Sequence, residues 1–347
     1  MSRTPVRITA AFAAIAAVAL TGCAGSTSPD AASDAAPAAP AASDAFPTSI
    51  THALGTTTID AQPERVATIA WGNQDVALAL GVVPVGVANQ VWSWTGATEP
   101  GLYEWTTDAI EALGGETPTI YDETDGIAFE AVADTAPQVI LGALSGLSAE
   151  DYATLSDIAP TVAYPEIPWY TSWRDQITYN AQALGLADEG DALIADIEQQ
   201  IADATADAGF EGKSAAFFYA SPADLSTISI YTGGDARTAL LADLGFDLPQ
   251  VAIDAMADGA FYQDFSAENA DRLADVDVIV TYGGEDLLPA LQADPLWSTL
   301  PAVQAGAVVA VGDGDAFSAA LSPTALSLPW VLDDYVAVLK DAAAKVQ

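Results

Sequence analysis

The chain has 347 residues, of which 48 are acidic, nine are basic and one is a cysteine. Its formal net charge of −39 makes nucleic acid and anionic lipid headgroups poor partners. The single cysteine excludes an internal disulfide, and the length is enough for one large domain or two lobes of ordinary size.

The first 22 residues have the organisation of a secretion signal. Two arginines precede an apolar run, Ala10 to Leu20, which is too short to cross a bilayer. The tetrapeptide that ends at Cys23 resembles the lipobox of bacterial lipoproteins, which implies cleavage after residue 22 and lipidation of Cys23. An ordinary secretory signal with an incidental cysteine is the alternative. Residues 23–47 are rich in Ala, Ser, Pro and Asp and predict a disordered stalk, so we expect an extracytoplasmic protein that is lipid-anchored to the outer face of the cell membrane.

Residues 48–187 alternate short β-rich runs with helical patterns, which is typical of an α/β lobe. A hairpin is expected at Ser49 to Ile59, turning at Leu54-Gly55, and a helix at Gln74 to Leu80, ended by Gly81. Buried strands are expected at Arg65 to Ala70, Val82 to Ala88, Thr119 to Tyr121, Val139 to Leu141 and Thr161 to Tyr164. Together these runs predict a parallel sheet.

Residues 188–208 predict one long amphipathic helix, with apolar residues at helical spacing and acids elsewhere. Residues 209–347 then repeat the α/β pattern and close with a helix from Leu326. Their strands are expected at Lys213 to Ala220, Ile228 to Tyr231, Val276 to Tyr282 and Ala307 to Val311. The predicted fold is therefore α/β, with two Rossmann-like lobes joined by one long helix and a ligand cleft between the lobes, at the carboxyl ends of the strands. Such a helix resists wide hinge closure.

Two glutamates occupy equivalent places in the two halves. Glu130 opens a short helical run that leads into the strand at Val139, and Glu268 opens a run that leads into the strand at Val276. A negative charge in the first turn of a helix is favourable by itself, so helix stability explains both acids without any partner.

Several segments between residues 48 and 345 resemble the iron-siderophore substrate-binding proteins of bacterial ABC importers in their order and spacing. They are Gly55 to Asp60 with Pro63 to Val66, Ala79 to Gly86, Phe129 to Leu141, Leu155 to Thr161, Phe265 to Glu268, Asp294 to Trp297 with Leu300 to Val303, and Ser327 to Trp330. The resemblance implies a two-lobe binding protein that delivers a ferric siderophore to an ABC permease. In this family a glutamate on each lobe docks on permease arginines, and the matching positions are Glu130 and Glu268.

Aromatic side chains dominate the ends of the predicted strands, where the ligand site is expected. A large, partly apolar chelate can be held by aromatic faces and a few hydroxyl and indole donors, without coordination of its saturated iron. A single aromatic residue is more often a core residue than a ligand contact. The candidate ligand-binding residues are Trp71, Trp92, Trp94, Trp169, Tyr170, Arg174, Tyr219, Tyr231, Arg237, Phe261, Tyr262, Tyr282 and Phe317.

Cationic groups are sparse among these candidates. No arginine or lysine occurs between Arg65 and Arg174, although many members of the family carry an arginine there that faces the ligand. Arg237 is the best cation, and pairing with Asp235 or Asp243 is its structural alternative. A ferric tris-catecholate is strongly anionic, whereas ferric hydroxamates are neutral or cationic, so we expect a hydroxamate siderophore. Solubility in salty surroundings explains most of the acidity without any ligand.

Other chemistries have less support. His52 is the sole histidine, so a site for bare zinc or manganese lacks its usual ligands. Asp122 to Gly126 resembles half a calcium loop, but Val132 stands where a bidentate glutamate is required. For an enzyme, paired carboxylates are the only catalytic device that the sequence leaves open.

Three further roles stay open for a binding protein of this kind. It could bind haem, with Tyr262 or Tyr282 as axial ligand, or it could bind cobalamin. It could also be a ligand-binding surface sensor or adhesin that takes no part in transport. We expect a monomeric binding protein, not an enzyme, which has no cofactor and carries the siderophore as cargo.

Overall fold

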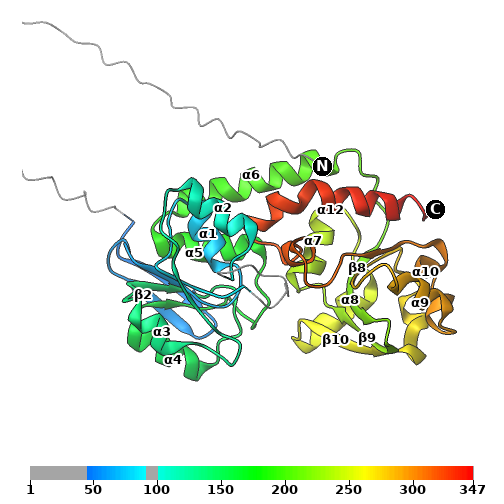
Figure 1. Ribbon diagram of the computed structural model, residues 1–347, viewed down its shortest axis with the longest axis horizontal. Coiled ribbons are helices and arrows are strands. Elements are labelled where there is room, and N and C mark those ends of the chain that lie inside the picture. The colour runs from blue at the N-terminus through cyan, green and yellow to red at the C-terminus, as the bar shows by residue number, and fades with distance from the viewer. Residues whose placement is uncertain (1–44, 91–100, 347) are drawn as a thin grey trace, which may run out of the picture. The chain divides into compact units, whose positions relative to one another are not determined.

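The computed structural model describes residues 45–90 and 101–346, and Figure 1 shows their elements in chain order. The signal peptide, Cys23, the stalk up to residue 44, and Trp92 and Trp94 lie outside these residues. The predicted stalk extends too far, because Phe46 packs with Leu184 and lies against Gly185. Among the described residues, no helix has both the length and the apolar composition needed to cross a membrane.

The first sheet is fully parallel, in the order β5-β4-β3-β6-β7. Its strands are β3 (Val66–Thr68), β4 (Gly86–Ala88), β5 (Thr119–Tyr121), β6 (Val139–Leu141) and β7 (Thr161–Val162). Every residue of β3, β4 and β6 is buried, because helices cover both faces of the sheet. The five predicted strands are confirmed, two of them with unchanged bounds.

Two groups of helices cover this sheet (Figure 1). One face carries α3 (Phe129–Asp134) and α4 (Ala149–Ile158), whose apolar side chains pack on Ala67, Ile69 and Ile140. The other face carries α1 (Asn73–Ala79), α2 (Glu104–Ala112) and α5 (Trp173–Leu184). A hairpin, β1 (Thr48–His52) and β2 (Gly55–Ile59), packs beside α5. Its turn is at Ala53 and Leu54, one residue earlier than predicted.

The second sheet is mixed, in the order β10-β9-β8-β11-β12. Strands β8 (Ala215–Ser221), β11 (Val278–Tyr282) and β12 (Val308–Ala310) run parallel, and β9 (Asp224–Tyr231) and β10 (Tyr262–Ser266) form antiparallel pairs at one edge. Four of these strands were predicted. Strand β10 was missed because Phe265 is its only buried residue, so its sequence carries no apolar alternation.

Helices cover both faces of the second sheet as well. One face packs against α7 and α12, and the other against η2, α9 and α10. The helices are α7 (Ala236–Asp243), α8 (Gln250–Asp254), η1 (Ala255–Asp258), η2 (Ala267–Leu273), α9 (Leu287–Ala293), η3 (Trp297–Thr299), α10 (Pro301–Ala305), α11 (Ala316–Ala320) and α12 (Ser327–Ala343).

Helix α6 (Ala187–Thr205) connects the two sheets and ends three residues before its predicted end. It buries Ile197 and Ile201 and contacts both α5 and α12, and Figure 1 shows α6 and α12 side by side. One apolar core includes Val76 from α1 and Val280 from β11, so it continues from one lobe into the other. Because all described residues belong to one compact unit, the lobe boundaries at 188 and 208 remain a prediction.

Candidate ligand-binding site

Trp71 lies at the centre of the candidate site, three residues after the end of the strand β3. Its ring centroid is 4.8 Å from that of Trp169, and the two ring planes are inclined by 43°. Ala70 and Trp169 both have left-handed backbone conformations, with φ of 55° and 63°. Such conformations cost roughly 1–3 kcal/mol in non-glycine residues and are concentrated at functional sites. The chain therefore holds these two indoles together at an energetic cost.

A cavity of about 50 Å³ separates the lobes at this point, and we call it the interlobe cavity. On the side of the first lobe it is lined by Trp71, Leu144 and Trp169. The opposite side consists of Asp235, Ala236, Arg237, Phe261 and Ser322. Four of the predicted ligand-binding residues, Trp71, Trp169, Arg237 and Phe261, thus face the same space.

Arg237 is buried in the second lobe, and its charge is compensated there. Its Nε and Nη2 atoms donate to the two carboxylate oxygens of Asp235 at 2.8 and 2.7 Å. The guanidinium also lies 3.7 Å from the ring centroid of Tyr231 and 5.9 Å from that of Tyr282. Burial alone would lower the pKa of Arg237, but the charge of Asp235 outweighs burial and raises that pKa well above its usual value. Pairing of Arg237 with Asp235, which the sequence left open as an alternative to ligand binding, is therefore correct. The pair brings no net charge to the cavity.

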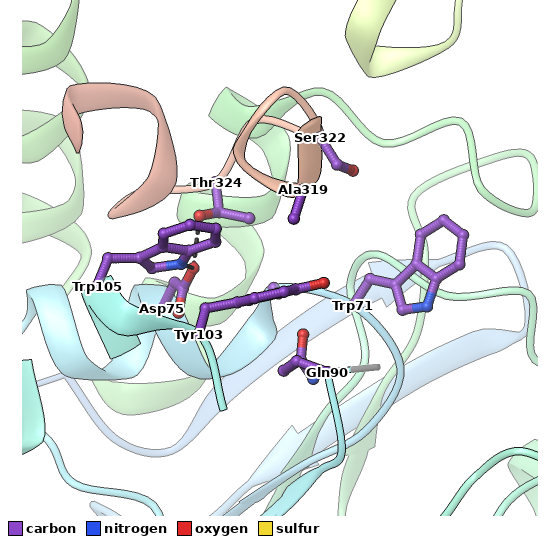
Figure 2. A pocket seen from close by; sticks show the side chains of 9 residues that line it. Trp71, Asp75, Gln90, Tyr103, Trp105, Ala319, Ser322 and Thr324 are labelled. Atoms are coloured by element: carbon purple, nitrogen blue, oxygen red, sulfur yellow. Dashed lines mark hydrogen bonds between the residues drawn. The ribbon is translucent and has the colours of Figure 1, made fainter. Parts of the chain in front are cut away.

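A second, narrower cavity of about 20 Å³ lies beside Trp71 (Figure 2). Figure 2 shows Tyr103 between Trp105 and Trp71, with its hydroxyl directed towards Trp71. Asp75 is fully buried at this cavity and accepts hydrogen bonds from Trp105, Thr106, Thr324 and Gln74. Burial raises the pKa of Asp75 to about 6, and these four hydrogen bonds oppose that rise. Because Thr324 lies in the segment before α12, the carboxylate also ties α1 to the C-terminal part of the chain.

A third cavity, of about 350 Å³, lies entirely within the first lobe, and we call it the lobe-one cavity. Trp71 and Trp169 line it as well as the interlobe cavity, so the two spaces adjoin at this pair of indoles. Glu123 follows β5 and is 8% exposed, and burial raises its pKa to about 7. Gly146 permits close packing here, since a Cβ atom at this position would collide with the indole of Trp169.

Tyr170 and Arg174 hold the two lobes together and line none of these cavities. The hydroxyl of Tyr170 is 2.8 Å from Oγ1 of Thr232, and its ring packs so closely on Gly234 that no Cβ atom would fit there. Arg174 forms ion pairs with Asp243 at 2.8 Å and Glu198 at 2.7 Å. The prediction that Arg174 contacts the ligand is therefore not supported, because its two ion pairs connect α5 with α6 and with α7.

The remaining predicted residues divide into two groups. Tyr231 and Tyr282 flank Arg237 and thus lie next to the interlobe cavity. Tyr219, Tyr262 and Phe317 line none of the three cavities described above. Tyr219 and Tyr262 are 45% and 43% exposed, and Phe317 packs edge-on against Tyr335 of α12.

Several cavity residues were missed at the sequence level. They are Asp75, Gln90, Tyr103, Trp105, Glu123, Leu144, Ser145, Ser322 and Thr324. Glu123 comes shortly after a predicted strand, much as Trp71 does, so its position could have identified it. Ser322 and Thr324 lie between two helices and carry no sequence signal of this kind.

The structure shows what His52 and Asp122, the residues considered as metal ligands, contact instead. His52 is buried, with Nε2 2.9 Å from Oγ1 of Thr57 and its ring against Tyr152. Asp122 accepts hydrogen bonds from Thr124 in a local turn. Within the described ranges, no group of three or more His, Cys, Asp or Glu side chains is placed to hold a metal ion.

The two candidate docking residues, Glu130 and Glu268, are both exposed. Each is the second residue of a short helix, Glu130 in α3 of the first lobe and Glu268 in η2 of the second. Their equivalent positions agree with the internal repeat, and a role at the permease remains a prediction.

Comparison with known proteins gives consistent matches along the folded part. A family model described as "Periplasmic binding protein" matches residues 66–313. The structure of PiaA from Streptococcus pneumoniae TIGR4 in complex with ferrichrome is 40% identical in sequence, with a TM-score of 0.83, and the match covers 86% of this chain and 99% of PiaA.

Two further proteins are similar to this chain over most of its length. "Probable siderophore-binding lipoprotein YfiY" from Bacillus subtilis (strain 168) is 26% identical over 291 residues, which are 76% of this chain and 80% of YfiY. SirA from Staphylococcus aureus, complexed with staphyloferrin B, is 24% identical with a TM-score of 0.66, covers 84% of this chain and 98% of SirA, and supports the fold alone.

Proposed function

Because the chain belongs to the periplasmic binding protein family, we propose that it binds a ferric siderophore between its lobes and delivers it to an ABC importer. The observation that carries this proposal is the interlobe cavity, where Trp71 and Trp169 face Arg237 and Phe261. Aromatic faces with a few polar groups suit a large, partly apolar chelate. The family consists of binding proteins, which supports a role without catalysis, and the relative PiaA was crystallised with ferrichrome.

A hydroxamate is the favoured class of siderophore. Arg237 is neutralised by Asp235, and no other basic residue lines the three cavities around Trp71. A tris-catecholate would therefore bring several negative charges to a site without a free cation, on a chain of net charge −39. A neutral or cationic ferric hydroxamate avoids this cost, and ferrichrome is a hydroxamate.

The protein would act as a lipid-anchored monomer outside the cell membrane. Cys23 is the proposed site of lipidation, and the name of the relative YfiY, a lipoprotein, supports this anchor. After ligand binding, the exposed Glu130 and Glu268 would contact the permease, one from each lobe.

Haem and cobalamin are the alternative ligands for the same fold. Of the two tyrosines considered as axial ligands of haem, Tyr282 lies beside Arg237, with its hydroxyl 3.4 Å from Nη1, whereas Tyr262 is exposed on β10. A surface sensor or adhesin would bind the same ligands without transport.

The test is a titration of the purified protein with ferrichrome, ferrioxamine B, ferric enterobactin, haem and cobalamin, followed by tryptophan fluorescence. We expect saturable quenching by the hydroxamates at submicromolar concentration, because Trp71 and Trp169 line the cavity. Tighter binding of ferric enterobactin would contradict the charge argument and leave siderophore binding intact. Binding of haem or cobalamin alone would contradict the proposed ligand.

A further inference from the structure

The lobe-one cavity contains a carboxylate that the protein does not satisfy. One oxygen of Glu123, Oε2, accepts a hydrogen bond from the backbone N–H of Ala70 at 3.0 Å. The other oxygen, Oε1, is buried and has no hydrogen-bond partner in the part of the chain that the structure describes. Buried polar atoms of folded proteins nearly always have a partner, and beside a cavity of about 350 Å³ that partner is water or a polar group of a bound ligand.

The walls of this cavity define the kind of partner. Trp71 and Trp169 supply indole rings, and Ile127 and Leu147 supply apolar surface. Among the described residues, no lysine, arginine or histidine lines the cavity. Aromatic faces together with a carboxylate attract an organic cation, because the negative face of an indole and the carboxylate act in the same sense. A bare metal ion would require more oxygen ligands than this cavity provides.

We propose that the lobe-one cavity is a subsite for a protonated amine carried by the siderophore, with Glu123 as its counter-ion. This inference rests on the proposed function, since the chelate itself would lie between the lobes, against Trp71 and Trp169. Trp71 and Trp169 line both spaces, so a flexible arm can pass along these indoles from the chelate to Glu123. The ligand class is a linear ferric hydroxamate that ends in a primary ammonium group.

The charge state of Glu123 makes such a subsite dependent on pH. Burial favours the neutral acid and raises its pKa to about 7. The other titratable groups around it are Tyr121, whose buried hydroxyl donates to the backbone oxygen of Thr68, and Asp151 of α4, which lines the same cavity. A bound ammonium group stabilises the ionised form, so its binding below pH 7 must displace a proton from Glu123. The affinity for the cationic ligand should fall by up to about tenfold for each pH unit below 7.

The experiment compares ferrioxamine B with its N-acetylated derivative, which keeps the hydroxamate chelate and lacks the positive charge. We expect the wild-type protein to bind ferrioxamine B about tenfold or more tightly than the acetylated form at pH 8, which corresponds to one ordinary charge-assisted hydrogen bond. In the Glu123→Gln variant the ratio of the two affinities should fall to near one. Because the readout is a ratio, a general weakening of binding cancels.

The matched control is Glu150→Gln, which makes the same chemical change at an exposed position of α4 and should keep the wild-type ratio. A wild-type ratio near one, or an unchanged ratio in Glu123→Gln, overturns the subsite while the siderophore function stands. If neither form of ferrioxamine nor ferrichrome binds the wild-type protein, both the subsite and the proposed function are overturned. A ratio that decreases between pH 8 and pH 6 in the wild type, and not in Glu123→Gln, supports the subsite independently.

Discussion

Each lobe buries an ionisable side chain beside a cavity that Trp71 and Trp169 line, and the two side chains differ in how they are paired. In the second lobe, Arg237 meets both oxygens of Asp235 and stacks on Tyr231. In the first lobe, Glu123 meets one backbone N–H and keeps an oxygen without a partner among the described residues. A charge paired within its own lobe is part of the fold, whereas an unpaired charge is available to a ligand. The difference makes the first lobe the side that can select a ligand by charge.

The largest expected effect concerns the exposed glutamates at equivalent positions of the two lobes, Glu130 and Glu268. Replacement of both Glu130 and Glu268 by alanine should reduce cellular uptake of radiolabelled ferric hydroxamate to background, because the loaded protein would no longer dock on the permease. Ligand affinity of the purified variant should stay within about twofold, as is usual for surface substitutions. Glu150→Ala is the control and should transport normally. Uptake that persists in the double variant would show that the docking assignment is wrong.

The ion pair of Arg237 with Asp235 in the second lobe should be essential for the stability of the fold. Arg237→Ala leaves Asp235 buried at 4% exposure without its partner, and breaking a buried pair in this way costs about 3–5 kcal/mol in the free energy of unfolding. Urea denaturation measures this loss. Arg272, which is exposed and lies over the ring of Phe265, provides the control, and Arg272→Ala should cost about 1 kcal/mol or less. Equal losses in the two variants would contradict the structural role of Arg237.

Ligand affinity should distinguish aromatic residues that line the cavities from aromatic residues that are exposed elsewhere. Trp71→Ala should weaken siderophore binding by about 30- to 100-fold, since the indole lines three adjoining cavities. Tyr219→Ala should change the affinity by about twofold or less, because Tyr219 is exposed and lines none of them. Fluorescence or calorimetric titration checks both variants. A larger loss for Tyr219 would place the ligand elsewhere in the cleft.

A smaller effect concerns the other buried acid of the first lobe, Asp75, which has four hydrogen-bond donors where Glu123 has one. Burial raises the pKa of Asp75 to about 6, so the folded state prefers the protonated acid more than the unfolded state does. Its contribution to stability is therefore fully present below the unfolded pKa of about 4 and is lost as the pH rises through about 6.

Asp75→Asn should remove this dependence. The free energy of unfolding of the wild type, relative to that of the variant, should fall by about 2–3 kcal/mol between pH 4 and pH 7. Titrations common to both proteins cancel in this difference, which urea denaturation at each pH measures. A difference that does not change with pH would contradict the burial of an ionisable carboxyl at this position.

Much of the fold was predictable because its strands are short apolar runs bounded by turns. Thr119–Tyr121 and Val139–Leu141 were found with their observed bounds, and the single long helix was found within three residues at each end. Strand β10 was not found, because an edge strand that buries one residue leaves no pattern. The candidate site was predicted in part: Trp71, Trp169, Arg237 and Phe261 line the interlobe cavity, whereas Asp75 and Glu123 were missed.

The sequence by itself determined the α/β class, the two sheets with a helix between them, and the acidity that disfavours anionic ligands. These properties depend on local periodicity and on total charge, which do not require knowledge of distant contacts. Only the tertiary structure decided that Arg237 is neutralised, that Arg174 serves the contact between lobes, and that Glu123 keeps an oxygen unpaired among the described residues. Whether a charge is paired depends on atoms brought together from distant parts of the chain, as Asp75 and Thr324 are, and spacing along the sequence does not record such contacts.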